Sequence, residues 1–225
     1  MDMAVEGVIF DFNGTLFWDT YLHNEAWDCY LEHHGFAWSD EEKNLKIHGK
    51  TNQDIFQAIY QRALSEDELG PMIMEKETIY QTLCRQQQMD LAPGAVALFG
   101  ALADGGIPFT IATGSGKENV DFYFELLHLE RWFRYDSIVY NDGSFRGKPH
   151  PDSFLLAADK LGIAPSSAVV FEDSISGIQA AENAGVGKIV IVNSNSEDYS
   201  SWPYKVITHF DEVRKQLLPQ FRGRF

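Results

Sequence analysis

Short apolar segments alternate with helix-like segments over most of this chain, and this alternation limits the possible fold more than any other feature. From about residue 91 onward, the spacing is typical of βαβ units. Such units form a parallel sheet with helices on both faces. The predicted strands span 109–112, 137–140, 168–171, 188–192 and 205–207, and the predicted helices span 95–104, 119–127, 152–161 and 175–183, with a last helix from residue 211.

The first predicted strand lies apart from the others in the sequence. Residues 8–10 are an apolar run that ends at Asp11, whereas residues 20–88 show helical periodicity with polar residues and no strand-like run. We therefore predict an α/β fold with a three-layer, Rossmann-like parallel-sheet core formed by residues 1–17 and 90–225. Residues 18–89 are predicted to form an all-helical domain inserted after the first strand.

The composition favours a compact protein and argues against several classes of partner. The 225 residues are 44% apolar and 23% charged. The formal net charge of −15 disfavours nucleic acid and anionic membranes, because both attract a basic surface. No segment approaches the roughly 18 apolar residues of a membrane span, and the N-terminus lacks the pattern of an export signal. We expect a cytoplasmic monomer without nucleic-acid or membrane partners.

Cysteine and histidine residues of the helical block give weaker expectations. Cys29 and Cys84 fall in helix-like segments far apart in the sequence, so we expect both to be reduced and buried. His33 and His34 are expected to lie on the surface.

Polar residues follow three predicted strands at their carboxyl ends. Asp11 follows the first strand, Thr113 follows the strand 109–112, and Glu172 and Asp173 follow the strand 168–171. In open parallel sheets, ligands bind beyond this edge, so we expect the carboxylates to converge there with the Thr113 hydroxyl. Clustered carboxylates repel one another unless a cation lies between them, and hard oxygen ligands suit Mg²⁺. The sequence therefore predicts a magnesium site.

Two further features predict a phosphate site at the same edge. The segment 113–116, Thr-Gly-Ser-Gly, is predicted to be a turn before a helix, where backbone N–H groups and hydroxyls bind anions. Lys148, in a loop before the next helix, supplies a point charge for the same anion. Each feature is common without function, but their joint occurrence favours a shared site.

Four short motifs follow one another along the chain: Asp-x-Asn-Gly-Thr-Leu, Thr-Gly-Ser, Gly-Lys-Pro and Glu-Asp-Ser. In these motifs and their order, the chain resembles the haloacid dehalogenase-like phosphotransferase superfamily, and within it the β-phosphoglucomutase-like branch. The resemblance covers essentially the whole chain. It implies that Asp11 is a nucleophile that becomes an aspartyl phosphate. It also implies a phosphate site formed by Gly14, Thr113, Gly114 and Lys148, and Mg²⁺ held by Asp11, the backbone carbonyl of Asn13, Asp173 and, through water, Glu172.

One position departs from the pattern of this superfamily. The pattern is Asp-x-Asp, whose second Asp protonates the leaving group and then activates water, whereas this chain has Asn13 there. An amide cannot carry that proton at neutral pH, and general acid–base catalysis is worth roughly 10²–10⁴-fold in rate. Three explanations stay open: a substitution that silences the enzyme, a natural residue whose reaction uses another proton donor or needs none, or a protein that has given up catalysis.

The inserted helical block resembles the cap that selects the substrate in this superfamily. His23 and Trp27 lie four residues apart on one predicted helix face and match site-facing positions, with core packing as the alternative for both. His23 is our candidate for a substitute proton donor. Lys76 resembles a cap lysine directed at the site, with a solvated surface residue as the alternative.

A second cap segment bears on the type of reaction. In residues 49–52, Asn52 stands where the mutases have an Arg that clamps a second phosphate. Gly49 and Lys50 precede it, and Lys50 could replace the charge of that Arg in part. We therefore expect a Mg²⁺-dependent phosphohydrolase of a small phosphorylated metabolite, such as a sugar phosphate. The alternatives are a β-phosphoglucomutase-type hexose-phosphate mutase and a catalytically weak protein that binds phosphorylated ligands or a partner.

Overall fold

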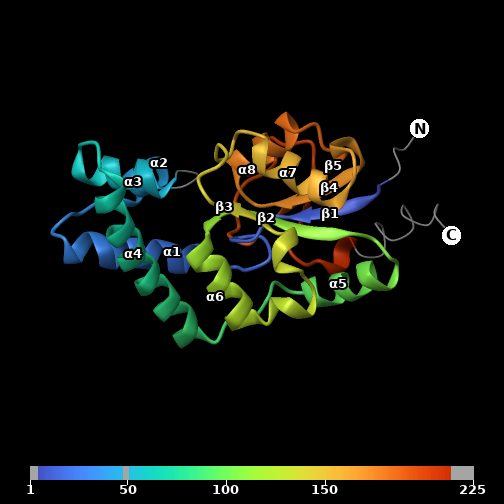
Figure 1. Cartoon of the computed structure of the whole chain (residues 1–225), viewed down its shortest axis with the longest axis horizontal. Coiled ribbons are helices and arrows are strands. Elements are labelled where there is room, and N and C mark those ends of the chain that lie inside the picture. The colour runs from blue at the N-terminus through green and yellow to red at the C-terminus, as the bar shows by residue number, and fades with distance from the viewer. Residues whose placement is uncertain (1–4, 48–50, 214–225) are drawn as a thin grey trace. The chain divides into compact units, whose positions relative to one another are not determined.

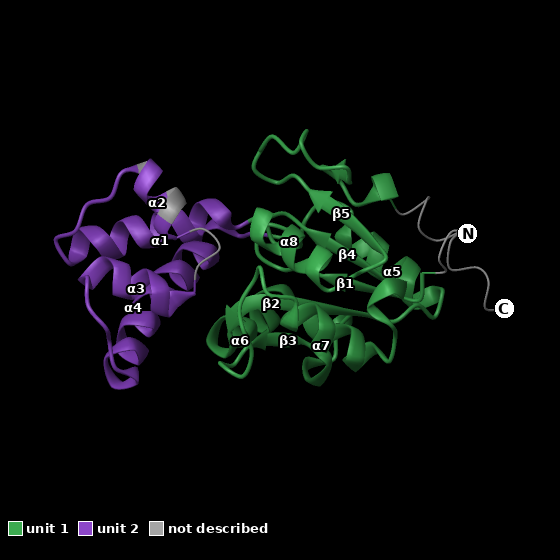
Figure 2. Cartoon of the chain, turned by 90° about the horizontal axis from the view of Figure 1, so that it is seen from above, with its two compact units in different colours: residues 1–18, 90–225 green, residues 19–89 purple. Residues whose placement is uncertain are grey.

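The computed structural model of the chain describes residues 5–47 and 51–213 (Figure 1). The chain divides into two compact units, which Figure 2 colours green and purple. We call Met1–Trp18 with Asp90–Phe225 the core unit, and Asp19–Met89 the helical unit. The helical unit is thus an insertion within the sequence of the core unit.

The core unit is built on a six-stranded parallel sheet in the order β3-β2-β1-β4-β5-β6. The strands are β1 (Gly7–Phe10), β2 (Phe109–Gly116), β3 (Val139–Asn141), β4 (Ala168–Glu172), β5 (Lys188–Val192) and β6 (Lys205–Ile207). Its helices are α5 (Ala95–Asp104), α6 (Lys117–Leu127), α7 (Asp152–Leu161) and α8 (Ile175–Asn183), with short 3₁₀ turns at Leu129–Arg131, Tyr135–Ser137 and Pro165–Ser167. This architecture confirms the predicted α/β class.

Both faces of this sheet are apolar, and successive residues of β1 face opposite sides of it. Ile9 packs with Phe154 of α7 and Ala181 of α8 in one buried cluster. Phe10 packs on the other face, where its ring lies 5.5 Å from that of Phe99 in α5. Helices therefore cover both faces, as Figure 1 shows for α7 and α8 above the sheet and α5 below it. A continuously apolar β1 is required because the strand is buried on both sides.

Two predicted elements of the core differ from the structure. The segment 113–116 is extended, not a turn, because β2 continues to Gly116, which pairs with Asn141 after a register shift. The strand predicted at 137–140 begins only at Val139, because residues 135–137 form a 3₁₀ turn. Most of the helix predicted from residue 211 lies outside the described residues.

The described elements of the helical unit are all helices: α1 (Thr20–His33), α2 (Asp40–Lys46), α3 (Asn52–Tyr60) and α4 (Glu66–Gln87). Capping boxes begin α2, α3 and α4, where a Ser or Thr and the acid three residues later satisfy backbone donors reciprocally. Aromatic rings fill the interior of the helical unit. The ring centroids of Trp27 and Tyr30 in α1 each lie 5.3 Å from that of Phe56 in α3.

The helices also bear on two expectations, one about the burial of the two cysteines and one about membrane-spanning segments. Cys84 is buried, but Cys29 is exposed, so the expectation that both thiols are buried is wrong for Cys29. The reason is that Cys29 lies on the outer side of α1, beside the exposed Asp28 and Glu32. Within the ranges that the structure describes, no helix combines the length and the apolar character that crossing a membrane requires.

Candidate active site

Asp11 lies directly beyond the end of β1, in the middle of the sheet. Its backbone N–H still donates to the carbonyl of Phe171 in β4, at 2.9 Å, so the residue is held beside the end of the neighbouring strand. The chain then turns tightly, and the N–H groups of Leu16 and Phe17 both donate to the carbonyl of Phe12. A third bond, from the N–H of Gly14 to the carbonyl of Phe17 at 2.7 Å, also closes this turn.

Gly14 allows that turn to approach the acidic residues. Its φ is +77°, a conformation that favours glycine, and a Cβ at this position would overlap the carboxylate of Asp173. The next residue, Thr15, donates its hydroxyl to Oδ1 of Asp173 at 2.9 Å. The loop after β1 is therefore in direct contact with the acid that follows β4.

Three carboxylates meet at this edge of the sheet. One oxygen from each of Asp11, Glu172 and Asp173 lies within 4.8 Å of the other two. Lys148 contributes the opposite charge, with its Nζ 2.5 Å from Oδ1 of Asp11 and 2.6 Å from Oε1 of Glu172. Asp11 is 6% exposed and Glu172 is fully buried, so this charge network lies in a largely dry environment. The second oxygen of Glu172 accepts from the backbone N–H of Ser174 at 2.6 Å.

Burial controls the protonation of this cluster. It raises the pKa of Asp11 from 3.8 to about 7, with Glu172 adding to the rise and Lys148 opposing it. The pKa of Asp173 is raised well above its ordinary value by burial and by the neighbouring Glu172 and Asp11. For Lys148, burial favours the neutral amine, but the charges of Asp11 and Glu172 outweigh it and raise its pKa above the ordinary value.

The acidic cluster fits a divalent cation. A single ammonium group cannot neutralise three carboxylates, and burial together with the charge of Glu172 raises the pKa of both Asp11 and Asp173. The available ligand atoms are carboxylate oxygens, which are the hard donors that Mg²⁺ prefers. These residues therefore fit Mg²⁺.

The side chain of Asn13 lies in a network of hydroxyl groups. Ser115 donates its hydroxyl to Oδ1 of Asn13 at 2.7 Å, and Thr113 donates to the same oxygen at 3.4 Å. The Asn13 amide nitrogen donates to the phenol oxygen of Tyr123 at 2.7 Å. Tyr123 is 1% exposed, and its ring stacks on Phe12 with centroids 4.4 Å apart. The Asn13 amide is thus held in one orientation by partners from β2 and α6.

The structure brings most of the predicted core residues together, with two differences in detail. Asp11, Glu172, Asp173 and Lys148 form one network, and Gly14 lies against it. The Thr113 hydroxyl contacts the Asn13 amide, not one of the acids, and Gly114 lies exposed near the end of β2.

Sequence reasoning missed Thr15, Ser115 and Tyr123 as parts of this site. Thr15 and Ser115 lie inside the quoted motifs and could have been selected for their hydroxyl groups. Tyr123 lies inside an ordinary helical pattern and offered no such signal.

Three of the predicted residues of the helical unit, His23, Trp27 and Lys76, lie in one cluster around the Lys76 ammonium group. Lys76 is 2% exposed, which excludes the solvated-surface alternative for this residue. Its Nζ lies 2.9 Å from Nδ1 of His23, 3.1 Å from Oε1 of Glu77 and 5.0 Å from the ring centroid of Trp27. Because an ammonium group only donates, His23 accepts through Nδ1 and directs Nε2 at Asp19, 3.4 Å away.

The remaining predicted residues of the helical unit are only partly described. Asn52 donates its amide to Oε1 of Glu77 at 3.4 Å, so it adjoins the cluster around Lys76. Gly49 and Lys50 lie outside the described residues.

Comparison with known proteins gives consistent matches over most of the chain. Residues 5–185 match the family model of haloacid dehalogenase-like hydrolases. The chain is 32% identical to fructose-1-phosphate phosphatase YqaB of Escherichia coli (strain K12) over 184 residues, which cover 81% of this chain and 94% of the relative.

Solved structures match as well. The crystal structure of a HAD hydrolase, family IA, variant 3, from Entamoeba histolytica HM-1:IMSS superposes with a TM-score of 0.86 at 36% identity, covering 96% of this chain and 99% of that one. The crystal structure of beta-phosphoglucomutase from Clostridium difficile superposes with a TM-score of 0.72 at 21% identity, covering 96% and 98%. The latter likeness concerns the fold alone.

Proposed function

This chain belongs to the haloacid dehalogenase-like hydrolase family, and from that membership we propose that it is a Mg²⁺-dependent phosphohydrolase of a small phosphorylated metabolite. The observation that carries the proposal is the buried Asp11 carboxylate, held 2.5 Å from Lys148 and beside Glu172 and Asp173 at the centre of the sheet edge. The closeness of these three carboxylates and one ammonium group supports the proposal, because phosphoryl transfer needs a nucleophile, a cation and a metal site close together.

The proposed reaction has two steps, both centred on Asp11. In the first, a carboxylate oxygen of Asp11 attacks phosphorus, the ester P–O bond breaks, and the alcohol leaves with its electron pair and takes up a proton. In the second, water attacks the aspartyl phosphate, which releases inorganic phosphate and restores the carboxylate. Lys148 lies close enough to Asp11 to neutralise charge on the transferring group.

The metal ion would be held by the carboxylates of Asp11 and Asp173 and by the backbone carbonyl of Asn13, with Glu172 supporting it through water. When bound, it would supply charge neutralisation for the phosphoryl oxygens. Thr113, Gly14 and Gly114 are proposed to bind the phosphoryl group together with Lys148.

A sugar phosphate is the substrate class that we propose. This choice is supported by the 32% identical relative, whose name specifies fructose 1-phosphate. We propose residues 18–89 as a cap domain that selects the substrate, through His23, Trp27, Gly49, Lys50, Asn52 and Lys76. Asn52 lacks the positive charge that would hold a second phosphate, which favours hydrolysis over transfer between two phosphorylated positions.

The test is phosphate release from a panel of sugar and polyol phosphates with Mg²⁺, for the native chain and for Asp11→Asn. We expect Asp11→Asn to be inactive and to give no acid-stable, hydroxylamine-labile phosphoenzyme. Asp142→Asn, at an exposed loop position, is the matched control and should keep full activity. Equal turnover by the native chain and Asp11→Asn would contradict the proposed nucleophile.

Product analysis separates the two alternative functions. A mutase would convert β-glucose 1-phosphate to glucose 6-phosphate. This conversion would depend on glucose 1,6-bisphosphate and would release no net phosphate. If the folded protein binds phosphorylated ligands but neither hydrolyses nor isomerises any of them, a binding function replaces catalysis.

A further inference from the structure

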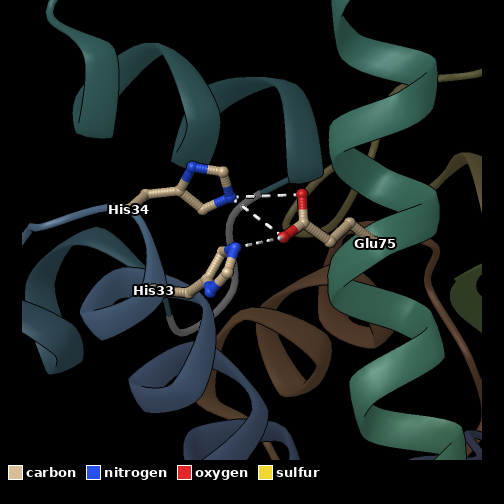
Figure 3. Close-up of side chains that lie close together, drawn as sticks. All are labelled: His33, His34 and Glu75. Atoms are coloured by element: carbon tan, nitrogen blue, oxygen red, sulfur yellow. Dashed lines mark hydrogen bonds and ion pairs between the residues drawn. The ribbon is translucent and has the colours of Figure 1, made fainter.

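A second group of metal-ligating side chains lies in the helical unit, apart from every residue proposed above for catalysis. His33 is the last residue of α1, His34 follows it as the C-cap, and Glu75 projects from α4. Figure 3 shows both imidazole rings directed at the Glu75 carboxylate. Nε2 of His34 lies 3.0 Å and 3.1 Å from the two carboxylate oxygens, and Nε2 of His33 lies 4.0 Å from Oε1.

These distances suit a single transition-metal ion. One ligand atom from each of the three residues lies within 4.8 Å of the other two. Around a tetrahedral ion with bonds of about 2.0–2.1 Å, neighbouring ligand atoms are about 3.4 Å apart. Convergence on one ion therefore requires only small rotations of the side chains. His33 is exposed, and Glu75 is partly exposed, so both have room to rotate.

An ion pair alone explains this arrangement poorly. An ion pair between exposed or partly exposed side chains contributes little stability, because water screens the charges. Here one carboxylate faces two imidazoles. A bound cation would accept the lone pairs of both rings and the charge of Glu75 together, and it would lie near the carboxyl end of α1, where the helix dipole favours positive charge.

We propose that His33, His34 and Glu75 form a binding site for a borderline transition-metal ion such as Zn²⁺, with water completing its coordination. Two nitrogen ligands and one oxygen ligand select Zn²⁺, Co²⁺, Ni²⁺ or Cu²⁺ over Mg²⁺. The site differs in this respect from the cluster of Asp11, Glu172 and Asp173, which offers only oxygen. Because the ligands come from α1 and α4, a bound ion cross-links these two helices.

Cys29 is a further metal-ligating side chain beside this group. It is exposed, lies one helical turn before His33, and lines the same surface depression as His33 and Glu75. Burial of part of the thiol, together with the neighbouring charges of Glu25, Glu32 and Asp28, raises its pKa, so the thiolate that binds metals is disfavoured at neutral pH. Among the described residues, the ligand atoms that lie within 4.8 Å of one another here belong to His33, His34 and Glu75, and this group does not include Cys29, so the site is assigned to the imidazoles and the carboxylate.

The test uses the full chain without a histidine tag, stripped with EDTA and titrated calorimetrically with Zn²⁺ in excess Mg²⁺, which saturates the acidic cluster. In parallel, Co²⁺ alone is followed by its visible absorption. We expect one Zn²⁺ per chain at this site and a higher thermal unfolding midpoint with Zn²⁺. His33→Ala, His34→Ala and Glu75→Gln should each weaken binding more than about tenfold.

Two control variants make the result specific. His128 and Glu130 form another exposed His–Glu pair, with Nδ1 of His128 3.5 Å from Oε1 of Glu130. His128→Ala removes this pair and should leave Zn²⁺ binding unchanged. Cys29→Ser should also leave it unchanged, and loss of Zn²⁺ binding in that variant would assign the ion to the thiol and overturn the proposal. Equal affinity in the native chain and in the His33→Ala/His34→Ala double variant would overturn it as well.

Discussion

Replacing Asn13 by Asp isolates the contribution of one proton to the proposed reaction. The two side chains have nearly the same shape, so the hydrogen bond from Ser115, now 2.7 Å long, can remain. Tyr123 accepts from the Asn13 amide at 2.7 Å, and its hydroxyl can rotate to donate to a carboxylate in the same place. The substitution therefore adds a titratable group without removing either contact.

The expected gain follows from the chemistry of the leaving group. General acid–base catalysis contributes about 10²–10⁴-fold, or about 3–5 kcal/mol of the barrier. A sugar hydroxyl is a poor leaving group, so phosphate release from sugar phosphates should rise by about that factor in Asn13→Asp. The first turnover of an activated aryl phosphate needs no proton, and its rate should change less than about tenfold.

The assay compares steady-state phosphate release from sugar phosphates with the burst of aryl alcohol in rapid mixing. Asn141→Asp is the matched control, because Asn141 accepts from the N–H of Gly143 at the end of β3 and a carboxylate can also accept there. Its rates should stay at those of the native chain. If the native chain already hydrolyses sugar phosphates efficiently and Asn13→Asp changes neither rate, the reasoning is refuted and another group supplies the proton.

Three further predictions follow from the same site. Lys148→Met removes the cation between Asp11 and Glu172. The free energy of unfolding of the metal-free variant, measured in urea at pH 8, should be about 3–5 kcal/mol lower than that of the native chain. An unchanged urea midpoint would contradict this. Burial raises the pKa of Asp11 from 3.8 to about 7, so Asp11 ionises more readily in the unfolded chain than in the folded one. The free energy of unfolding of the metal-free protein should therefore fall as the pH rises from about 4 to about 7. Added Mg²⁺ should therefore raise the thermal midpoint more at pH 8 than at pH 5, and the reverse order would contradict the burial argument. Gly14→Ala forces a methyl group into the Asp173 carboxylate at a φ of +77°, so calorimetry should show weaker Mg²⁺ binding, whereas unchanged affinity would place the metal elsewhere.

Several features of the fold could be predicted from local sequence alone. The strand–helix alternation identified the parallel sheet, because a strand buried on both faces must be apolar throughout, as Val8–Phe10 is. The grouping of Asp11 with Glu172 and Asp173 could be expected because parallel strands end at one edge of a sheet. The family resemblance inferred from the motifs is confirmed by the match of residues 5–185.

Local pattern was insufficient where a residue's surroundings come from another element. The expectation for Cys29 was wrong because a cysteine's side of a helix depends on what that helix packs against. The extension of β2 to Gly116 depends on its pairing with β3.

The detailed chemistry of both candidate sites was decided only by the tertiary structure. Asn13 and Tyr123 are 110 positions apart, and His34 and Glu75 are 41 apart. Periodicity along the chain records which face of an element is apolar, but it carries no information about which side chains of two elements meet. Sequence therefore determined the family, the sheet and the acids at its edge, while packing determined the partners of Asn13, the burial of Lys76 and the meeting of two histidines with Glu75.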